Sequence, residues 1–220
     1  NAYANSDIWC GFGKIIEYNN QATITLEQPG TLPQKINDSD KNLITHLKIK
    51  GNINGTDLRF IREMAGVSVM GKKTEGELTK LDLSEAQIVS GGDYYYQDYN
   101  DTKYYTKDDE LGVCAFSNCS GLKNLTISKE VSSIKDIAFN NSYDNLELES
   151  VYVAWENPIE AGSFFDRINI SNCTLYVPQG TKEAYANADV WKDFGNIIEY
   201  DATGIDKVTN RSDVKDQCYS

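Results

Sequence analysis

The sequence contains very little histidine and no excess of positive charge. His46 is its one histidine, and 33 acidic residues outnumber 21 basic residues, which gives a net charge of −12. Nucleic acid and anionic membrane surfaces both require a positive face, so we expect neither as a partner. No apolar run approaches the ~18 residues of a membrane span. The excess of acidic residues favours solubility and says little about the fold.

The cysteines show none of the spacings of a metal site or a disulfide framework. They are Cys10, Cys114, Cys119, Cys173 and Cys218, and no two form a CxxC pair. A zinc motif is therefore absent, and an odd count argues against a complete set of bridges. We expect small buried hydrophobic side chains. A Cys114–Cys119 bridge and a reactive thiol stay open as alternatives.

No catalytic array stands out. The sequence has no G-x-S-x-G and no Gly-rich phosphate loop. His46 lies in ITHLKI, where Leu47 and Ile49 should point inward, so His46 should face solvent. Three adjacent acids at 108–110 normally stay hydrated, although glycosidases use paired carboxylates. A calcium site from Asp98 and Asp101 with residues 108–109 lacks the usual ligand spacing. We therefore predict no enzyme, no cofactor and no metal.

A long self-match joins the two ends of the chain. Residues 1–18 return as residues 183–200 at a constant offset, with twelve of 18 positions identical. Such a match indicates duplication, which is typical of modular proteins. We interpret residues 1–18 as the cap-like tail of an upstream repeat module and residues 183–200 as the closing cap of a complete one. The polar residues 201–220 are predicted to be a linker to a further C-terminal segment.

A shorter repeat lies inside residues 19–200. Hydrophobic residues alternate at 44–49, 78–83, 122–127, 148–153 and 175–177, which predicts a series of short strands. A first strand is expected at 22–26 and a short helix at 32–36. A second motif, a small residue followed by Phe, recurs at a similar spacing. It occurs at Ala115-Phe116, Ala138-Phe139 and Ser163-Phe164.

The spacing of these units predicts an α/β repeat solenoid. One strand and one return segment in about 20–29 residues is the period of a leucine-rich repeat. Stacked units would form a parallel sheet on the concave face, with short helices or irregular turns on the convex face.

Two of the spacings between successive predicted strands are longer than the rest. They predict insertions at about 51–77 and 84–110. The first contains a predicted helix with Thr56 as its N-cap, Gly66 just after its end, and Leu58, Ile61 and Ala65 on one face. The second is rich in tyrosine.

The residues of this repeat resemble a known family. Residues 114–139, CAFSNCSGLKNLTISKEVSSIKDIAF, are close to the repeat of BspA-like leucine-rich repeat surface proteins of Bacteroides-type bacteria. Residues 174–191 resemble the terminal cap of such arrays, and residues 55–66 and 78–97 resemble an N-terminal module of gut-bacterial surface proteins. The likeness covers roughly residues 20–200. It departs from the family pattern at 145–150 and at Ser163-Phe164-Phe165.

The resemblance implies export to the cell surface, the extracellular space or the periplasm. It also implies adhesion or contact with host matrix or glycans, without naming a ligand.

Two surfaces are candidates for binding. Solenoids bind through their concave sheet, and side chains between the buried strand positions should project from it. These candidates are Lys48, Lys80, Asp82, Asn124, Thr126, Ser150, Tyr152 and Tyr176. Tyr152 and Tyr176 should stand side by side on successive strands.

The second candidate is the loop that carries Tyr94, Tyr95, Tyr96, Tyr99, Tyr104 and Tyr105. Tyrosine offers a rigid ring and a hydroxyl, which suit sugars and protein epitopes. The alternative is that these rings pack on the repeats and fix the insertion in place.

Three functions follow as hypotheses. The preferred one is a non-enzymatic module for adhesion or macromolecule recognition, with a protein or glycan partner bound on the concave sheet. A carbohydrate-binding module that uses exposed Tyr rings is the second. A structural spacer between surface domains is the third. The sequence does not predict the oligomeric state.

Overall fold

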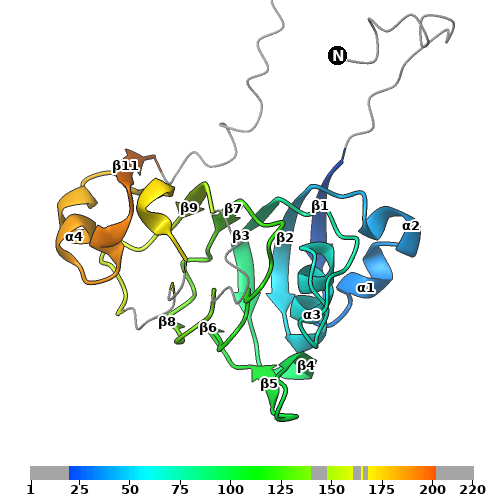
Figure 1. The fold of residues 1–220 in the computed structure, drawn as a ribbon. Helices are drawn as coiled ribbons and strands as arrows, with labels where there is room; N and C mark the ends of the chain where they lie inside the picture. The colour runs from blue at the N-terminus through cyan, green and yellow to red at the C-terminus, as the bar shows by residue number, and fades with distance from the viewer. Residues whose placement is uncertain (1–19, 140–147, 161–164, 166–167, 202–220) are drawn as a thin grey trace, which may run out of the picture.

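A parallel seven-stranded sheet forms the centre of the molecule (Figure 1). The computed structural model describes residues 20–139, 148–160, 165 and 168–201. The strands of the sheet follow the chain from one edge to the other. They are β1 (Gln21–Leu26), β2 (His46–Ile53), β3 (Lys80–Ile88), β7 (Asn124–Thr126), β9 (Ser150–Tyr152), β10 (Thr174–Pro178) and β11 (Asn196–Tyr200). The predicted strand at 22–26 and those at the repeat positions are confirmed in place.

One row of aliphatic side chains runs across six of these strands. Each member faces the next in the strand register, and each is at most 8% exposed: Leu47, Leu81, Leu125, Val151, Leu175 and Ile197. Burial alternates along β2 and β3. Most parallel sheets are covered on both faces. In this sheet one face packs on the core, and the other, which we call the open face, carries polar and aromatic residues.

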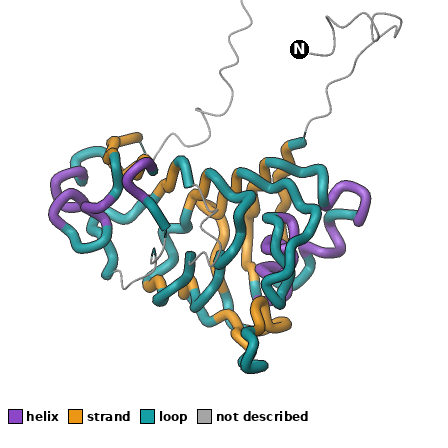
Figure 2. The backbone as a smooth tube through the Cα atoms, viewed as in Figure 1, coloured by secondary structure: helices purple, strands orange, loops and turns teal. Residues whose placement is uncertain are grey.

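A second layer lies across the core from the sheet and consists mainly of loops (Figure 2). Two short strands, β6 (Glu110–Leu111) and β8 (Ser133–Ile134), pair in parallel within it. Phe116, Phe139 and Phe165 stack in series, with ring centroids 5.6 and 5.1 Å apart. The predicted series continued at Phe164, which lies outside the described residues. Among the described residues, the ring of Phe165 contacts Phe139.

The strands β2 and β3 run on into the ranges predicted as insertions. The alternation of buried residues continues in these ranges at Ile53, Ala86 and Ile88. The strand pairing of β2 and β3 therefore extends into both predicted insertions. Helix α3 (Gly55–Met64) follows β2 directly and places Leu58, Ile61 and Ala65 in the core, as predicted.

Asn54 is the N-cap of α3, so the prediction of Thr56 is wrong. The side chain of Asn54 accepts from the backbone of Thr56, and the Asp57 carboxylate accepts from the backbone N–H of Asn54, which closes a capping box. Gly66 follows the helix with φ of +95°, the left-handed conformation predicted for it.

Asp57 also ties two further segments to α3. Its carboxylate is fully buried and accepts from the backbone N–H groups of Gly30 and Leu32, at 2.6 and 2.9 Å. These residues lead into α1 (Leu32–Lys35), the short helix expected at 32–36, and α2 (Asp38–Lys41) follows.

The tyrosine-rich insertion is an antiparallel hairpin of β4 (Gly91–Gln97) and β5 (Lys103–Thr106). It lies next to α3 at one end of the molecule (Figure 1). A Cβ on Gly55 would lie 1.9 Å from the carbonyl oxygen of Asp93. The glycine at the first turn of α3 therefore allows the hairpin backbone to approach the helix.

Residues 182–200 close the far edge of the sheet, and we call them the terminal cap. The cap contains α4 (Lys182–Asn187), the 3₁₀ turn η2 (Trp191–Asp193) and β11. A further 3₁₀ turn, η1 (Ile170–Asn172), precedes β10. Trp191 is fully buried and contacts Trp155 and Tyr185 edge to face.

Several predictions fall on residues outside the described ranges. They are the cap-like tail at 1–18, nearly all of the linker at 201–220, and the environments of Cys10 and Cys218. Within the described ranges, no helix is both long and apolar enough to cross a membrane.

The phenylalanine stack should carry a large share of the stability. Phe139 is fully buried between two rings, so Phe139→Ala leaves a cavity and should cost about 3–5 kcal/mol of unfolding free energy. The matched control is Tyr99→Ala, because Tyr99 is 96% exposed; its effect should stay within about 0.5 kcal/mol. Denaturant unfolding measures both. A Phe139→Ala chain as stable as the control would contradict this packing.

Candidate functional site

The open face carries one continuous row of side chains that changes character along the sheet. In register order the row is Lys48, Asp82, Thr126, Tyr152, Tyr176 and Ile198. Charged residues occupy its first part, on β2 and β3, and aromatic and aliphatic residues its last part, on β9 to β11. The order follows from the parallel register, which places every second residue of each strand on this face.

Two lysines of β2 form ion pairs with two acids of β3 on the open face. A bulge between Lys48 and Lys50 shifts the register of β3. The Glu85 carboxylate then lies 2.6 Å from Lys48 Nζ and 2.9 Å from Lys50 Nζ, and Asp82 lies 3.7 Å from Lys48. Hydrogen bonds from Lys48 and Lys50 lower the pKa of Glu85. This half of the open face therefore presents paired charges.

The aromatic half centres on Tyr152 and Tyr176, which stand side by side as predicted. Their rings stack with centroids 4.2 Å apart and planes within 3°. Tyr200 meets Tyr152 edge to face at 5.6 Å. Burial, with the neighbouring Tyr176 and Tyr200, raises the pKa of Tyr152 to about 12. Its hydroxyl is therefore neutral near pH 7 and can both donate and accept a hydrogen bond.

Ile198 extends this aromatic row to the edge of the sheet. It lies beside Tyr176 in register and is 39% exposed. Sequence reasoning placed Ile198 and Tyr200 in the cap and missed their part in the open face. The signal was present in NIIEY, where inward Ile197 requires that Ile198 point outward.

The middle of the open face has little exposed area. Thr126 in this row and Ser150 in the neighbouring row are each 8% exposed, and Asn124 donates from Nδ2 to Ser150 Oγ at 2.8 Å. Thr126 was predicted as a ligand contact; its side chain is instead largely covered, because the bulky Tyr152 stands next to it. Lys80 is half-buried beside His46 in the neighbouring row.

The second candidate, the β4–β5 hairpin, is held against the body of the protein. Tyr95 is 1% exposed, and its hydroxyl donates to the carbonyl oxygen of Val113 at 2.8 Å. A ring buried in this way cannot contact a ligand, so Tyr95 leaves the candidate set. Tyr94 lies between the cations of Arg59 and Lys103, at 5.4 and 4.7 Å. Of the predicted set, Tyr99 and Tyr105 are the well exposed rings.

A buried arginine under the hairpin escaped sequence reasoning. Arg62 is fully buried, and its Nη1 donates to the carbonyl oxygens of Cys114 and Ala115. Its Nε and Nη2 have no hydrogen-bond partner among the described residues, and the guanidinium lies 5.1 Å from the ring of Tyr96. A buried cation gains from an aromatic face. Tyr96 therefore has a structural role in holding the hairpin.

The acidic residues of this region each have a separate structural partner. Asp108 accepts from the backbone of Ser90, Asp109 from the amide of Gln87, and Glu110 pairs with Lys135. Asp98 accepts from backbone N–H groups in the hairpin turn. No group of three or more His, Cys, Asp or Glu residues that could hold a metal occurs in the part of the chain that the structure describes.

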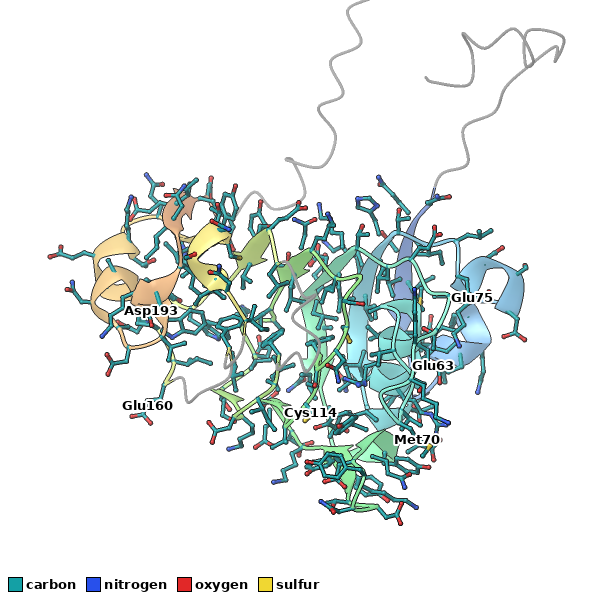
Figure 3. All side chains as sticks on the ribbon, viewed as in Figure 1. Glu63, Met70, Glu75, Cys114, Glu160 and Asp193 are labelled. Carbon is teal, nitrogen blue, oxygen red and sulfur yellow. The ribbon has the colours of Figure 1, made fainter. Side chains whose placement is uncertain are left out.

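The described cysteines are buried free thiols, the first of the three alternatives weighed above. Cys114, Cys119 and Cys173 form no bridge. Burial raises the pKa of Cys119 to about 11 and that of Cys173 to about 12. Cys114 lies near the hairpin (Figure 3), and burial raises its pKa too. A thiol with a raised pKa is a poor nucleophile at neutral pH.

A cleft of about 160 Å³ lies beside α3 and is lined by Pro33, Thr56, Arg59, Phe60, Glu63 and Asp93. Ligand pockets commonly measure about 300–1,000 Å³, so this cleft is small for an organic substrate. Glu63, on its rim, already pairs with Lys41. The cleft therefore offers no spare charge for catalysis at that position.

A scan against protein-family models finds no match for this chain, and a search among curated proteins finds none either.

His46 provides a direct probe of the charged half, because its NMR signal is unique. Burial, and then the charge of Lys80, lower its pKa below 6.5. The unfolded chain thus takes up the proton first as pH falls. The stability contribution is complete above pH ~6.5 and is lost below it. Lys80→Gln should move the pKa of His46 part of the way back. A wild-type midpoint at or above 6.5, or no response to Lys80→Gln, would contradict this environment.

Proposed function

We propose that this chain is a non-enzymatic interaction module that recognises a protein surface through the aromatic half of its open face. The observation that carries the proposal is the row of Tyr152, Tyr176 and Ile198, which is apolar and partly exposed on an otherwise polar face. Interface centres are enriched in aromatic residues and poor in charge. The charged half, whose ions already pair with one another, suits the rim of such an interface.

In this proposal the fold is a leucine-rich repeat solenoid of the BspA-like type, and the open face is its concave side. Three observations support it. The short strands pair in parallel and in chain order, the inward residues align in one row, and the Phe rings stack in a second row across the core. Each unit buries its apolar edge only against its neighbours, as repeat proteins do. The expected location is the cell surface, the extracellular space or the periplasm.

The ring geometry favours a protein partner over a glycan. Carbohydrate binding by tyrosine requires a free ring face on which a sugar can lie. Tyr152 and Tyr176 cover one face of each other at 4.2 Å, and Tyr200 stands edge-on to Tyr152. Rings stacked across adjacent strands leave mainly their edges for contact with a partner. Such rims suit the side chains of a protein epitope, where tyrosine serves as a rigid anchor.

The test is a binding screen against immobilised fibronectin, laminin and type IV collagen, with a set of polysaccharides in parallel. For a protein that binds, Tyr152→Ala/Tyr176→Ala should weaken binding at least about 30-fold, the effect of losing a hot spot worth about 2 kcal/mol. Tyr99→Ala/Tyr105→Ala is the matched control on the hairpin and should leave affinity unchanged. Circular dichroism verifies that both double variants are folded.

Three results would overturn the proposal. Loss of binding in the hairpin variant alone would move the site to β4–β5. Binding to polysaccharides only would replace protein recognition with the carbohydrate hypothesis. If the folded wild-type chain bound nothing in the screen, recognition of a matrix protein would be wrong and the spacer hypothesis would be preferred.

A further inference from the structure

Next to the ion pairs of the open face lies one lysine that no acid balances. On β2 and β3 two lysines pair with two acids: Lys48, Lys50, Asp82 and Glu85. Lys80 lies in the neighbouring row of the same face and forms no ion pair with the described residues. The whole chain carries a net charge of −12. The local excess of positive charge on the open face therefore has the opposite sign to the molecule as a whole.

His46 stands beside this lysine and enlarges the excess when it is protonated. The two residues are partners in the parallel register of β2 and β3. Thr45 Oγ1 lies 2.8 Å from His46 Nδ1 and also donates to the carbonyl oxygen of Asn20 at 3.3 Å. A hydroxyl that donates elsewhere can only accept here, so we assign the proton of the neutral ring to Nδ1. Nε2 is then the nitrogen that gains a proton, and with it a hydrogen-bond donor, as pH falls.

No acid opposes this pair across the described part of the sheet. Its register partners on either side are the amides Gln21 on β1 and Asn124 on β7. Asp82, two residues along β3 from Lys80, lies 3.7 Å from Lys48. Two adjacent cations repel when both are charged, and an opposite charge beside them offsets that repulsion. An anion supplied by a partner would therefore be stabilised at this position.

The pair lies close to the aromatic half of the open face. Lys80 shares its row with Asn124 and Ser150. Ser150 lies two residues before Tyr152 on β9. Two inter-strand steps of about 4.8 Å and two strand residues of about 3.3 Å separate the Cα atoms of Lys80 and Tyr152 by roughly 12 Å. An extended peptide covers that distance in about four residues. One short segment of a partner can therefore contact both sites.

Building on the proposed recognition of a protein by the open face, we propose that Lys80 and His46 bind a carboxylate of that partner. The carboxylate is carried on an extended segment whose apolar side chain packs against Tyr152 and Tyr176. One lysine and one histidine match the single charge of an Asp or Glu side chain. The acid should stand about four residues from the apolar anchor, because an extended segment then spans the two sites.

A carboxylate at this position makes binding depend on pH. It favours the protonated imidazole, so binding raises the pKa of His46 from the value below 6.5 that burial, and then Lys80, give it. Protons are taken up on binding, and affinity therefore increases as pH falls. An Asp or Glu side chain keeps its charge at pH 5.5, since its ordinary pKa is about 4. For peptides without histidine, affinity should rise at least about threefold from pH 7.5 to pH 5.5. The His46→Gln change should remove this rise.

The test is a selection of random 12-residue peptides, displayed on phage, against the full chain at pH 6. Peptides that lose binding to Tyr152→Ala/Tyr176→Ala bind the open face, and they should share an acid near a hydrophobic residue. In one such peptide, changing the acid to its amide should weaken binding at least about fivefold. Lys80→Gln should weaken binding to a similar extent, and the two changes together no further than either alone. Lys107→Gln, the same change of charge at an exposed position, should have no effect.

The outcomes separate this proposal from the proposed function. Open-face peptides without an acid, or acid and Lys80 changes whose effects add, would overturn the carboxylate site and leave recognition by the open face intact. Affinity that stays constant with pH, or that rises equally in His46→Gln, would also overturn it. If no selected peptide depends on Tyr152 and Tyr176, recognition of an extended acidic segment is wrong. The matrix-protein screen then decides separately whether the open face recognises a folded surface.

Discussion

The structure depends on one constraint, the register that aligns Leu47, Leu81, Leu125, Val151, Leu175 and Ile197 across the sheet. Side chains alternate between the faces of a strand, so a slip of one residue would expose a strand's entire buried set. The same register fixes the open face, because the residue after each buried one points the other way. The Tyr152–Tyr176 stack is therefore a direct consequence of how Val151 and Leu175 are buried.

The sequence predicts well whatever depends on alternation or local capping. The strand positions, the inward set, the outward direction of His46 and the pairing of Tyr152 with Tyr176 all follow from a period of two and a parallel order. The N-cap of α3 could also be predicted from the sequence. Asn54 and Thr56 are both good caps, but only Asn54 has an acid, Asp57, three residues later to complete the capping box.

Features that depend on distant neighbours were beyond sequence reasoning. Tyr95 is buried because Gly112, far along the chain, has no Cβ; one placed there would lie 2.4 Å from the Tyr95 hydroxyl. From its local sequence, Arg62 would be expected to be an exposed residue of α3. It is buried because the hairpin covers it. In each case a tertiary contact determines whether the side chain is buried or exposed. The local sequence is compatible with both, so it does not predict the outcome.

The two tyrosine-rich regions thus differ in how their rings are held. The hairpin buries Tyr95 and places Tyr96 over Arg62, which fixes it to α3. The open face leaves its stacked pair partly exposed beside Ile198, and we propose that recognition occurs there. The most direct measurement is photo-crosslinking of the matrix-protein panel from a benzophenone side chain at position 198. The matched position is Met70, 56% exposed beside the hairpin (Figure 3). If the open face binds the partner, a crosslinked protein forms from position 198 and none from position 70; a product from position 70 with none from position 198 would contradict recognition by the open face.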